Sequence, residues 1–164
     1  MYLIRGQHNL KLFKSRHPNV LLSGTIGNFD GLHLGHQAIL EKIKNNAQKY
    51  NAKTIVFFTE PHAAEYFSKV RDKNQIPPPR ICPWREKFQL LKKSKIDFAC
   101  FLKFNSKLRT MSPDDFISQI LDSINLVSFT VGDDFRFGAG RKGDTDLLKN
   151  WGEKKGILVE NTEQ

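Results

Sequence analysis

An apolar segment at residues 20–26 leads into a glycine-rich loop, and the loop leads into an amphipathic segment at residues 37–50. The apolar character of the first segment is typical of a strand covered on both faces, as in a parallel sheet. The second segment places Ile39, Ile43 and Ala47 on one stripe, which predicts a helix. A strand, a tight loop and a helix in this order form the basic unit of an α/β domain.

The rest of the chain repeats this alternation of strands and helices. Ser112 is expected to cap a helix that has Pro113 in its first turn, and Thr145 to cap the last helix. Residues 2–4 are expected to form a short strand or lead-in, and residues 10–18 a connection. The pattern predicts a Rossmann-like, doubly wound α/β fold with a largely parallel, five-stranded sheet. The expected strands lie at residues 20–26, 54–58, 97–102, 126–131 and 157–159, and the expected helices at 37–50, 83–93, 113–124 and 145–155.

Two glycine-rich loops are expected at one edge of this sheet. In the doubly wound strand order 3-2-1-4-5 the first and fourth strands are neighbours, and ligands bind at their carboxyl ends. One loop, from Gly27 to His36, follows the first strand, and another, from Gly132 to Gly138, follows the fourth. The two loops should therefore face each other across one binding site.

Length and charge restrict the class of protein. The chain has 164 residues, which suits one domain, and a net charge of +9, which suits a phosphorylated small molecule or a nucleic acid as partner. Because the lysines are scattered through predicted helices, we expect no nucleic-acid partner. No apolar run approaches the length of a membrane span, so we expect no membrane partner either. Cys82 and Cys100 are far apart in the sequence, as in a reduced, cytoplasmic protein.

The first loop has the composition of a phosphate site, although it is neither a Walker A loop nor Gly-x-Gly-x-x-Gly. Backbone amides of such a loop and the positive end of a helix dipole favour phosphate. If the helix has begun by His33, then His33 and His36 share one face and suit the α- and β-phosphates of a nucleotide. The alternatives are a zinc pair or two ordinary surface histidines. Since no cysteine or carboxylate cluster accompanies them, we expect no protein-bound metal. Asp30 either braces the turn or orients a ligand.

The second loop mixes acids, guanidinium groups and aromatic rings at the end of a strand. Asp134 can accept a hydrogen bond from a ribose or an adenine edge, and Arg136 or Arg141 can clamp a phosphate. The alternative for the arginines is surface pairing with neighbouring acids. Phe135 and Phe137 can flank a flat ring, or one of them belongs to the core.

Several motifs, in order along nearly the whole chain, resemble those of one enzyme family. The first loop reads Gly-Asn-Phe-Asp-Gly-Leu-His-Leu-Gly-His-Gln. Its His-x-Gly-His core is shared by the wider nucleotidyltransferase superfamily, whereas the later motifs are more specific. On these residues the chain resembles the adenylyltransferase module of prokaryotic FAD synthetase, the bifunctional riboflavin kinase/FMN adenylyltransferase. The later motifs are Phe-x-Glu-Pro-His from Phe58, Arg80 with Arg85-Glu-Lys, Phe104-Asn105, Ser112-Pro-Asp-Asp-Phe, and Val131-Gly-Asp-Asp-Phe-Arg-Phe-Gly with Arg141-Lys-Gly-Asp.

The resemblance implies a reaction in which ATP, accompanied by Mg²⁺, and FMN give FAD and pyrophosphate. It implies one adenylyltransferase domain over residues 1–164, with the ATP phosphates on the first loop. Phe67 either stacks on the flavin or packs in the core. The implied catalytic residues are His33, His36 and Asp30; the implied ATP-binding residues are Gly27, Asn28, Phe29, Gly35, Gly132, Asp134 and Arg141; the implied FMN-binding residues are Glu60, Pro61, His62, Phe67, Arg80, Asn105, Phe135 and Phe137.

The chain also departs from the family pattern. Thr59 stands where the family usually has an aromatic residue, and Ala63 replaces a common second proline. The Ser-Ser-Thr-x-x-Arg signature and the riboflavin kinase domain are expected after the last strand, and the sequence reaches Gln164 before either. We therefore expect a truncated module without riboflavin kinase activity and with reduced adenylyl transfer. Two alternatives remain: a nucleotide- or flavin-binding module without catalysis, and a related transferase with phosphopantetheine or nicotinate mononucleotide as acceptor.

Overall fold

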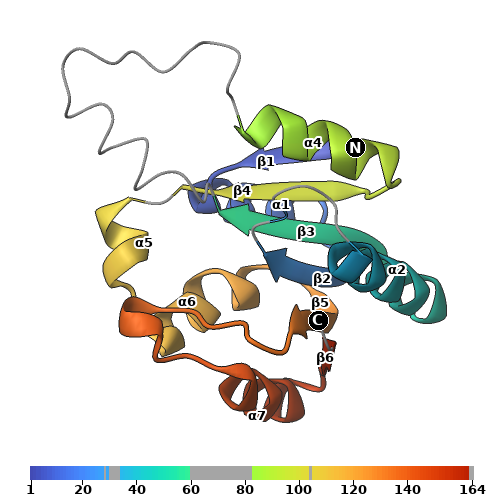
Figure 1. Ribbon diagram of the computed structural model, residues 1–164. Coiled ribbons are helices and arrows are strands. Elements are labelled where there is room, and N and C mark those ends of the chain that lie inside the picture. Colours follow the sequence, from blue (N-terminus) through green and yellow to red (C-terminus); the bar gives the residue numbers. More distant parts are fainter. Residues whose placement is uncertain (28, 30–33, 60–82, 104, 163–164) are drawn as a thin grey trace, which may run out of the picture.

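The structure is a computed structural model, and it describes residues 1–27, 29, 34–59, 83–103 and 105–162. These residues are organised around one parallel sheet. Within these residues, six strands lie in the order β1-β4-β3-β2-β5-β6, and each pairs in parallel with its neighbours (Figure 1). The strands are β1 (Tyr2–Arg5), β2 (Leu22–Gly27), β3 (Lys53–Thr59), β4 (Phe98–Leu102), β5 (Leu126–Gly132) and β6 (Leu158–Thr162).

The strand order confirms the predicted doubly wound arrangement. β2 lies between β3 and β5, so that the first and fourth of the predicted strands are neighbours and Thr25 pairs with Thr130. The sheet has one strand more than predicted, because Tyr2–Arg5 pairs along its whole length with β4. This additional strand lies at the edge of the sheet and leaves the predicted order of the other five unchanged.

Helices cover both faces of the sheet. They are α1 (Leu10–Arg16), α2 (Leu34–Lys49), α4 (Pro83–Lys93), α5 (Ser106–Thr110), α6 (Pro113–Gln119) and α7 (Thr145–Lys155), with short 3-10 turns at Gln7–Asn9, Leu121–Ser123 and Ala139–Arg141. Ile43 of α2 and Leu91 of α4 pack with Phe58 in one buried cluster. Phe13 of α1 and Trp151 of α7 belong to a second cluster on the other face. Among the helices of the described ranges, none combines the length and apolar character needed to cross a membrane.

The connection predicted at residues 10–18 is wrong, because α1 occupies most of it. Leu10 is 0% exposed and Phe13 is 4% exposed, and the Phe13 ring lies 4.9 Å from that of Phe98 on β4. Two apolar residues one turn apart are a short pattern among basic neighbours. The helix is therefore stabilised by packing against the sheet, and this packing cannot be recognised from the local sequence.

The predicted cap of α6 is confirmed, whereas α7 is capped by a different residue from the one predicted. The Ser112 hydroxyl accepts a hydrogen bond from the backbone N–H of Asp115 at 3.1 Å, with Pro113 as first residue of α6. Gly156 ends α7 in the left-handed conformation, with φ of 72°. The predicted cap of α7 is wrong by one residue. The carboxylate of Asp144, rather than the Thr145 hydroxyl, accepts from the N–H of Leu147 at 2.9 Å.

Candidate functional site

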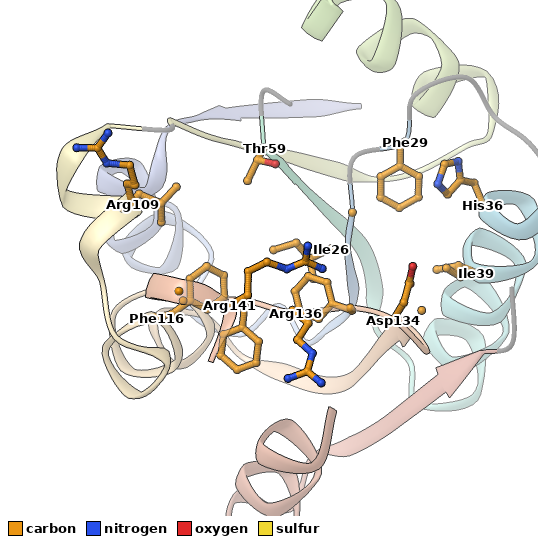
Figure 2. A pocket seen from close by; sticks show the side chains of 17 residues that line it. Ile26, Phe29, His36, Ile39, Thr59, Arg109, Phe116, Asp134, Arg136 and Arg141 are labelled. Atoms are coloured by element: carbon orange, nitrogen blue, oxygen red, sulfur yellow. The ribbon is translucent and has the colours of Figure 1, made fainter. Parts of the chain in front are cut away.

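A cavity of about 600 Å³ lies where the carboxyl ends of β2 and β5 are side by side (Figure 2). Gly27 ends β2 and Gly132 ends β5, and both line the cavity. His36 of α2 lies on one side and Arg109 of α5 on the other (Figure 2). In the described residues, the two predicted loops do meet at this edge of the sheet. This is the edge at which doubly wound domains bind ligands.

His36 stands at the amino end of a helix. α2 begins at Leu34, so that Gly35 and His36 lie in its first turn, where unpaired backbone N–H groups and the helix dipole favour an anion. The His36 ring packs against the Phe29 ring, with centroids 4.8 Å apart and planes at 45° (Figure 2). Both side chains line the cavity. The imidazole is therefore held in place by an aromatic neighbour while it faces the open space.

Phe29 adopts a backbone conformation that few side chains tolerate. Its φ is 51°, in the left-handed region, and its side chain is 2% exposed. Such a conformation costs on the order of 1–3 kcal/mol and is found disproportionately at functional sites. Burial of the ring and its contact with His36 offset this cost.

The loop after β5 is tied to its surroundings by backbone hydrogen bonds. Phe137 and Gly143 exchange two of them, at 3.1 and 2.8 Å, and the N–H of Ala139 donates to the carbonyl of Met111 at 2.7 Å. Gly138 has φ of 79°, and a Cβ there would lie 2.8 Å from Pro113. The close approach to α6 therefore requires glycine, and the loop is held as a rigid wall of the cavity.

Three charged side chains of this loop line the cavity: Asp134, Arg136 and Arg141, all of them exposed. In Figure 2 the carboxylate of Asp134 points toward the side where α2 lies, and Arg141 extends across the cavity toward Ile26. Within the part of the chain that the structure describes, neither guanidinium group forms an ion pair. The neighbouring acids are engaged elsewhere, since Asp144 caps α7 and Asp133 accepts a hydrogen bond from β6. The predicted alternative of surface pairing is therefore not observed for these arginines.

Phe135 and Phe137 stack on each other. Their centroids are 5.7 Å apart and their planes differ by 11°, which is the geometry of a direct aromatic pair. No planar ring fits between them, so they do not flank a ligand in the way that the sequence suggested. Phe137 is 5% exposed, and its ring also packs against that of Phe116, with centroids 5.3 Å apart. The pair forms one aromatic wall, with Phe135 the more exposed member.

Asn105 does not line the cavity. Its side chain accepts a hydrogen bond from the N–H of Leu108 at 2.9 Å and so caps α5. The short helix that it starts brings Leu108 and Arg109 to the cavity wall. Arg109 could not be selected from the sequence, because a single arginine in a five-residue helix belongs to no motif. Thr59, Ile26 and Phe116 also line the cavity without having been predicted as site residues.

Eight predicted site residues lie outside the described residues: Asn28, Asp30, His33, Glu60, Pro61, His62, Phe67 and Arg80. The eight predicted residues that line the cavity are Gly27, Phe29, His36, Gly132, Asp134, Phe135, Phe137 and Arg141.

Comparison with known proteins gives a consistent result. The model of a family described as FAD synthetase matches residues 15–164. A "Bifunctional riboflavin kinase/FMN adenylyltransferase" of Buchnera aphidicola subsp. Acyrthosiphon pisum is 40% identical over 155 residues, covering 94% of this chain and 46% of the relative. The protein of the same name from Escherichia coli K12 is 38% identical over 164 residues, covering 99% of this chain and 50% of the relative. The chain thus spans about half the length of the curated relatives that it matches.

A solved structure shares the fold. It is the crystal structure of a macrolide-efflux protein from Streptococcus pneumoniae and superposes with a TM-score of 0.71. The superposition covers 99% of this chain and 58% of the other protein's chain. Its sequence identity is 19%, so the likeness concerns the fold alone.

Proposed function

Because the chain belongs to the FAD synthetase family, we propose that it transfers the adenylyl group of ATP to FMN, giving FAD and pyrophosphate. The observation that supports this most directly is the cavity at the ends of β2 and β5. It brings the amino end of α2, with His36, opposite a loop that carries Asp134 and Arg141. A helix terminus and a guanidinium group on opposite walls suit a polyphosphate that lies between them.

In this proposal the residues act by binding and by stabilising charge. The oxygen of the FMN phosphate attacks the α-phosphorus of ATP, and the bond from that phosphorus to the bridging oxygen breaks. The electron pair of that bond leaves with pyrophosphate. His36, the backbone amides of its helical turn and Arg141 bind the phosphate oxygens as the charge moves. Asp134 accepts a hydrogen bond from the ribose or the adenine.

Mg²⁺ accompanies ATP in this proposal. The cavity offers one carboxylate among the described residues, that of Asp134. Those residues contain no group of three or more His, Cys, Asp or Glu side chains able to hold an ion. Mg²⁺ usually retains several waters and binds through one or two carboxylates together with phosphate oxygens. The cavity therefore fits an ion that arrives on the nucleotide, where it neutralises phosphate charge.

The remaining assignments rest on the resemblance of the motifs. We propose that the flavin binds beside the aromatic wall of Phe135 and Phe137. We also propose a cytoplasmic location, in keeping with Cys100 as a free, buried thiol. Catalytic roles are proposed for His33 and Asp30, an ATP contact for Asn28, and FMN contacts for Glu60, Pro61, His62, Phe67, Arg80 and Asn105.

The test measures binding and turnover separately. Calorimetric titration with ATP and with FMN gives the two affinities, and pyrophosphate release together with chromatography of FAD gives the transfer. We expect FAD to form only when ATP, Mg²⁺ and FMN are all present. His36→Ala should lower kcat/KM by about 10²–10³-fold, while His8→Ala, an exposed histidine outside the cavity, should not.

Three outcomes would change the conclusion. Tight ATP binding without FAD formation would indicate a nucleotide-binding module. Pyrophosphate release with phosphopantetheine or nicotinate mononucleotide, but not with FMN, would indicate a transferase with another acceptor. Equal activity of His36→Ala and the unmodified chain would remove the proposed site.

A further inference from the structure

The edge strand β6 contacts both walls of the cavity through consecutive residues, Glu160 and Asn161. Neither side chain lines the cavity. Successive side chains of a strand point to opposite faces of a sheet. Glu160 therefore contacts α2 on one face of the sheet. Asn161, the next residue, contacts the start of the loop after β5.

Glu160 holds the helix that carries His36. The side chain of Asn46 donates a hydrogen bond to Oε1 of Glu160 at 3.0 Å, and Nζ of Lys42 lies 3.1 Å from Oε2. Asn46 and Lys42 are one turn apart on α2, so both carboxylate oxygens of Glu160 contact the same face of the helix. Lys42–Glu160 is the only ion pair found among the described residues.

Asn161 holds the loop that carries Asp134 and Arg141. Its side-chain amide donates a hydrogen bond to Oδ1 of Asp133, the residue directly before Asp134. The backbone N–H of Asp133 donates in turn to the carbonyl of Thr162 at 3.1 Å, which extends the β5–β6 ladder beyond the strand. The start of the loop is thus fixed to β6 by one side chain and one backbone bond.

We propose that Glu160 and Asn161 are positioning residues that set the spacing between the two walls of the cavity. This inference rests on the proposed function, in which His36 on one wall and Arg141 on the other bind one polyphosphate at the same time. Charge-stabilising groups act well only when they are held in place before the ligand arrives. Loosening either contact should weaken ATP binding although no atom that touches ATP is removed.

The first experiment compares Asn161→Leu and Glu160→Ala with matched changes on α7, Asn150→Leu and Glu153→Ala. Both control residues are exposed and make no contact with the cavity. Backbone hydrogen exchange is measured without nucleotide, and ATP affinity by titration calorimetry. We expect Asn161→Leu to speed exchange in residues 133–143 and Glu160→Ala to speed it in α2, which Glu160 contacts at Lys42 and Asn46. Each should weaken ATP binding roughly three- to tenfold, the effect of losing one such hydrogen bond.

The second experiment exchanges the polar groups of the loop contact. Asn161→Asp places two carboxylates against each other and should weaken ATP binding more than Asn161→Leu does. The double variant Asp133→Asn/Asn161→Asp restores an amide donor and a carboxylate acceptor in reversed positions. We expect it to recover both ATP affinity and the exchange rates of the loop. A purely structural role would change the melting temperature without this pattern in ATP affinity and KM.

The failures of the two proposals can be told apart. Absence of FAD formation in the unmodified chain contradicts the proposed function and leaves the exchange and ATP measurements to judge the positioning. Unchanged exchange in the loop and in α2 for Asn161→Leu and Glu160→Ala overturns the positioning, whatever the activity. So does faster exchange with ATP affinity equal to that of the α7 controls, or a double variant no better than Asn161→Asp.

Discussion

The ring of Phe29 occupies the space that Gly27 leaves open, since a Cβ on Gly27 would lie 2.9 Å from Cε2 of that ring. The same ring packs against His36. Phe29 therefore links the end of β2 to the imidazole at the start of α2. The position of His36 depends on a glycine nine residues before it.

We predict that Gly27→Ala displaces Phe29 and, with it, His36. The added methyl group would lie too close to the Phe29 ring, at 2.9 Å from Cε2, and such overpacking costs about 1–3 kcal/mol of stability. The expected results are a lower melting temperature and a lower rate of FAD formation, measured by thermal denaturation and by chromatography. The double variant Gly27→Ala/Phe29→Leu, with a smaller side chain against the new methyl, should regain part of the stability but not the rate. A Gly27→Ala variant with unchanged activity would show that His36 is held independently of Phe29.

A second prediction concerns Arg141, whose guanidinium group extends into the cavity. Arg141→Ala should raise the KM for ATP about tenfold or more, because a hydrogen bond to a charged group contributes roughly 1.5–3 kcal/mol. Arg141→Lys should retain only part of the affinity, since an ammonium group cannot bind phosphate in a bidentate manner. The neighbouring exposed Lys142→Ala is the matched control, because Lys142 does not line the cavity. Equal losses in Arg141→Ala and Lys142→Ala would point to a general charge effect.

Much of the fold could be predicted because its signals are local. The apolar strands, the spacing along α2 and the Ser112 cap each lie within one short segment, and the doubly wound order then follows from general topology. The short helix α1 was missed because Leu10 and Phe13 show their role only when packed on the sheet. Asp144 and Thr145 are both good caps, and the choice between them depends on how the chain enters the helix.

The glycines and charged residues of the two loops could be predicted as part of the candidate site. The arrangement of its aromatic residues, and the residues that come from other segments, could not. The facing loops at Gly27 and Gly132 follow from strand order alone. The stacking of Phe135 on Phe137 depends on the turn between them, and the presence of Arg109 depends on how α5 is oriented. Neither appears as a sequence pattern, because both result from contacts between segments.

A third prediction concerns the pH dependence that Glu160 gives to stability. Burial alone raises the pKa of this carboxyl, but hydrogen bonds from Asn46 and Lys42 and the charges of Lys42 and Lys49 outweigh it and lower the pKa below its ordinary value of 4.5. A carboxyl whose pKa is lower in the folded state stabilises that state above the unfolded pKa, and the contribution is lost as the pH falls through the folded value. Solvent screening limits it to about 1 kcal/mol or less.

Glu160→Gln should therefore reduce the loss of unfolding free energy between pH 7 and pH 3, measured by urea denaturation at both pH values. Glu153→Gln on α7, which changes the same charge on an exposed side chain, is the control. An identical pH dependence in Glu160→Gln and the unmodified chain would contradict the prediction.

A fourth prediction concerns the buried hydroxyl groups between β2 and β5. Ser23 and Ser128 share a hydrogen bond of 2.6 Å, whereas the hydroxyls of Thr25 and Thr130, paired two residues further along, are buried without a partner among the described residues. A buried hydroxyl without a hydrogen bond costs about 1–3 kcal/mol, so Thr130→Val should stabilise the chain and raise its melting temperature by roughly 2–4 °C per kcal/mol. Ser128→Ala should lower the melting temperature, because it leaves the hydroxyl of Ser23 without its hydrogen-bond partner. Thermal denaturation of the two variants compares them directly, and a Thr130→Val variant that melts as low as Ser128→Ala would show that the Thr130 hydroxyl is bound in solution.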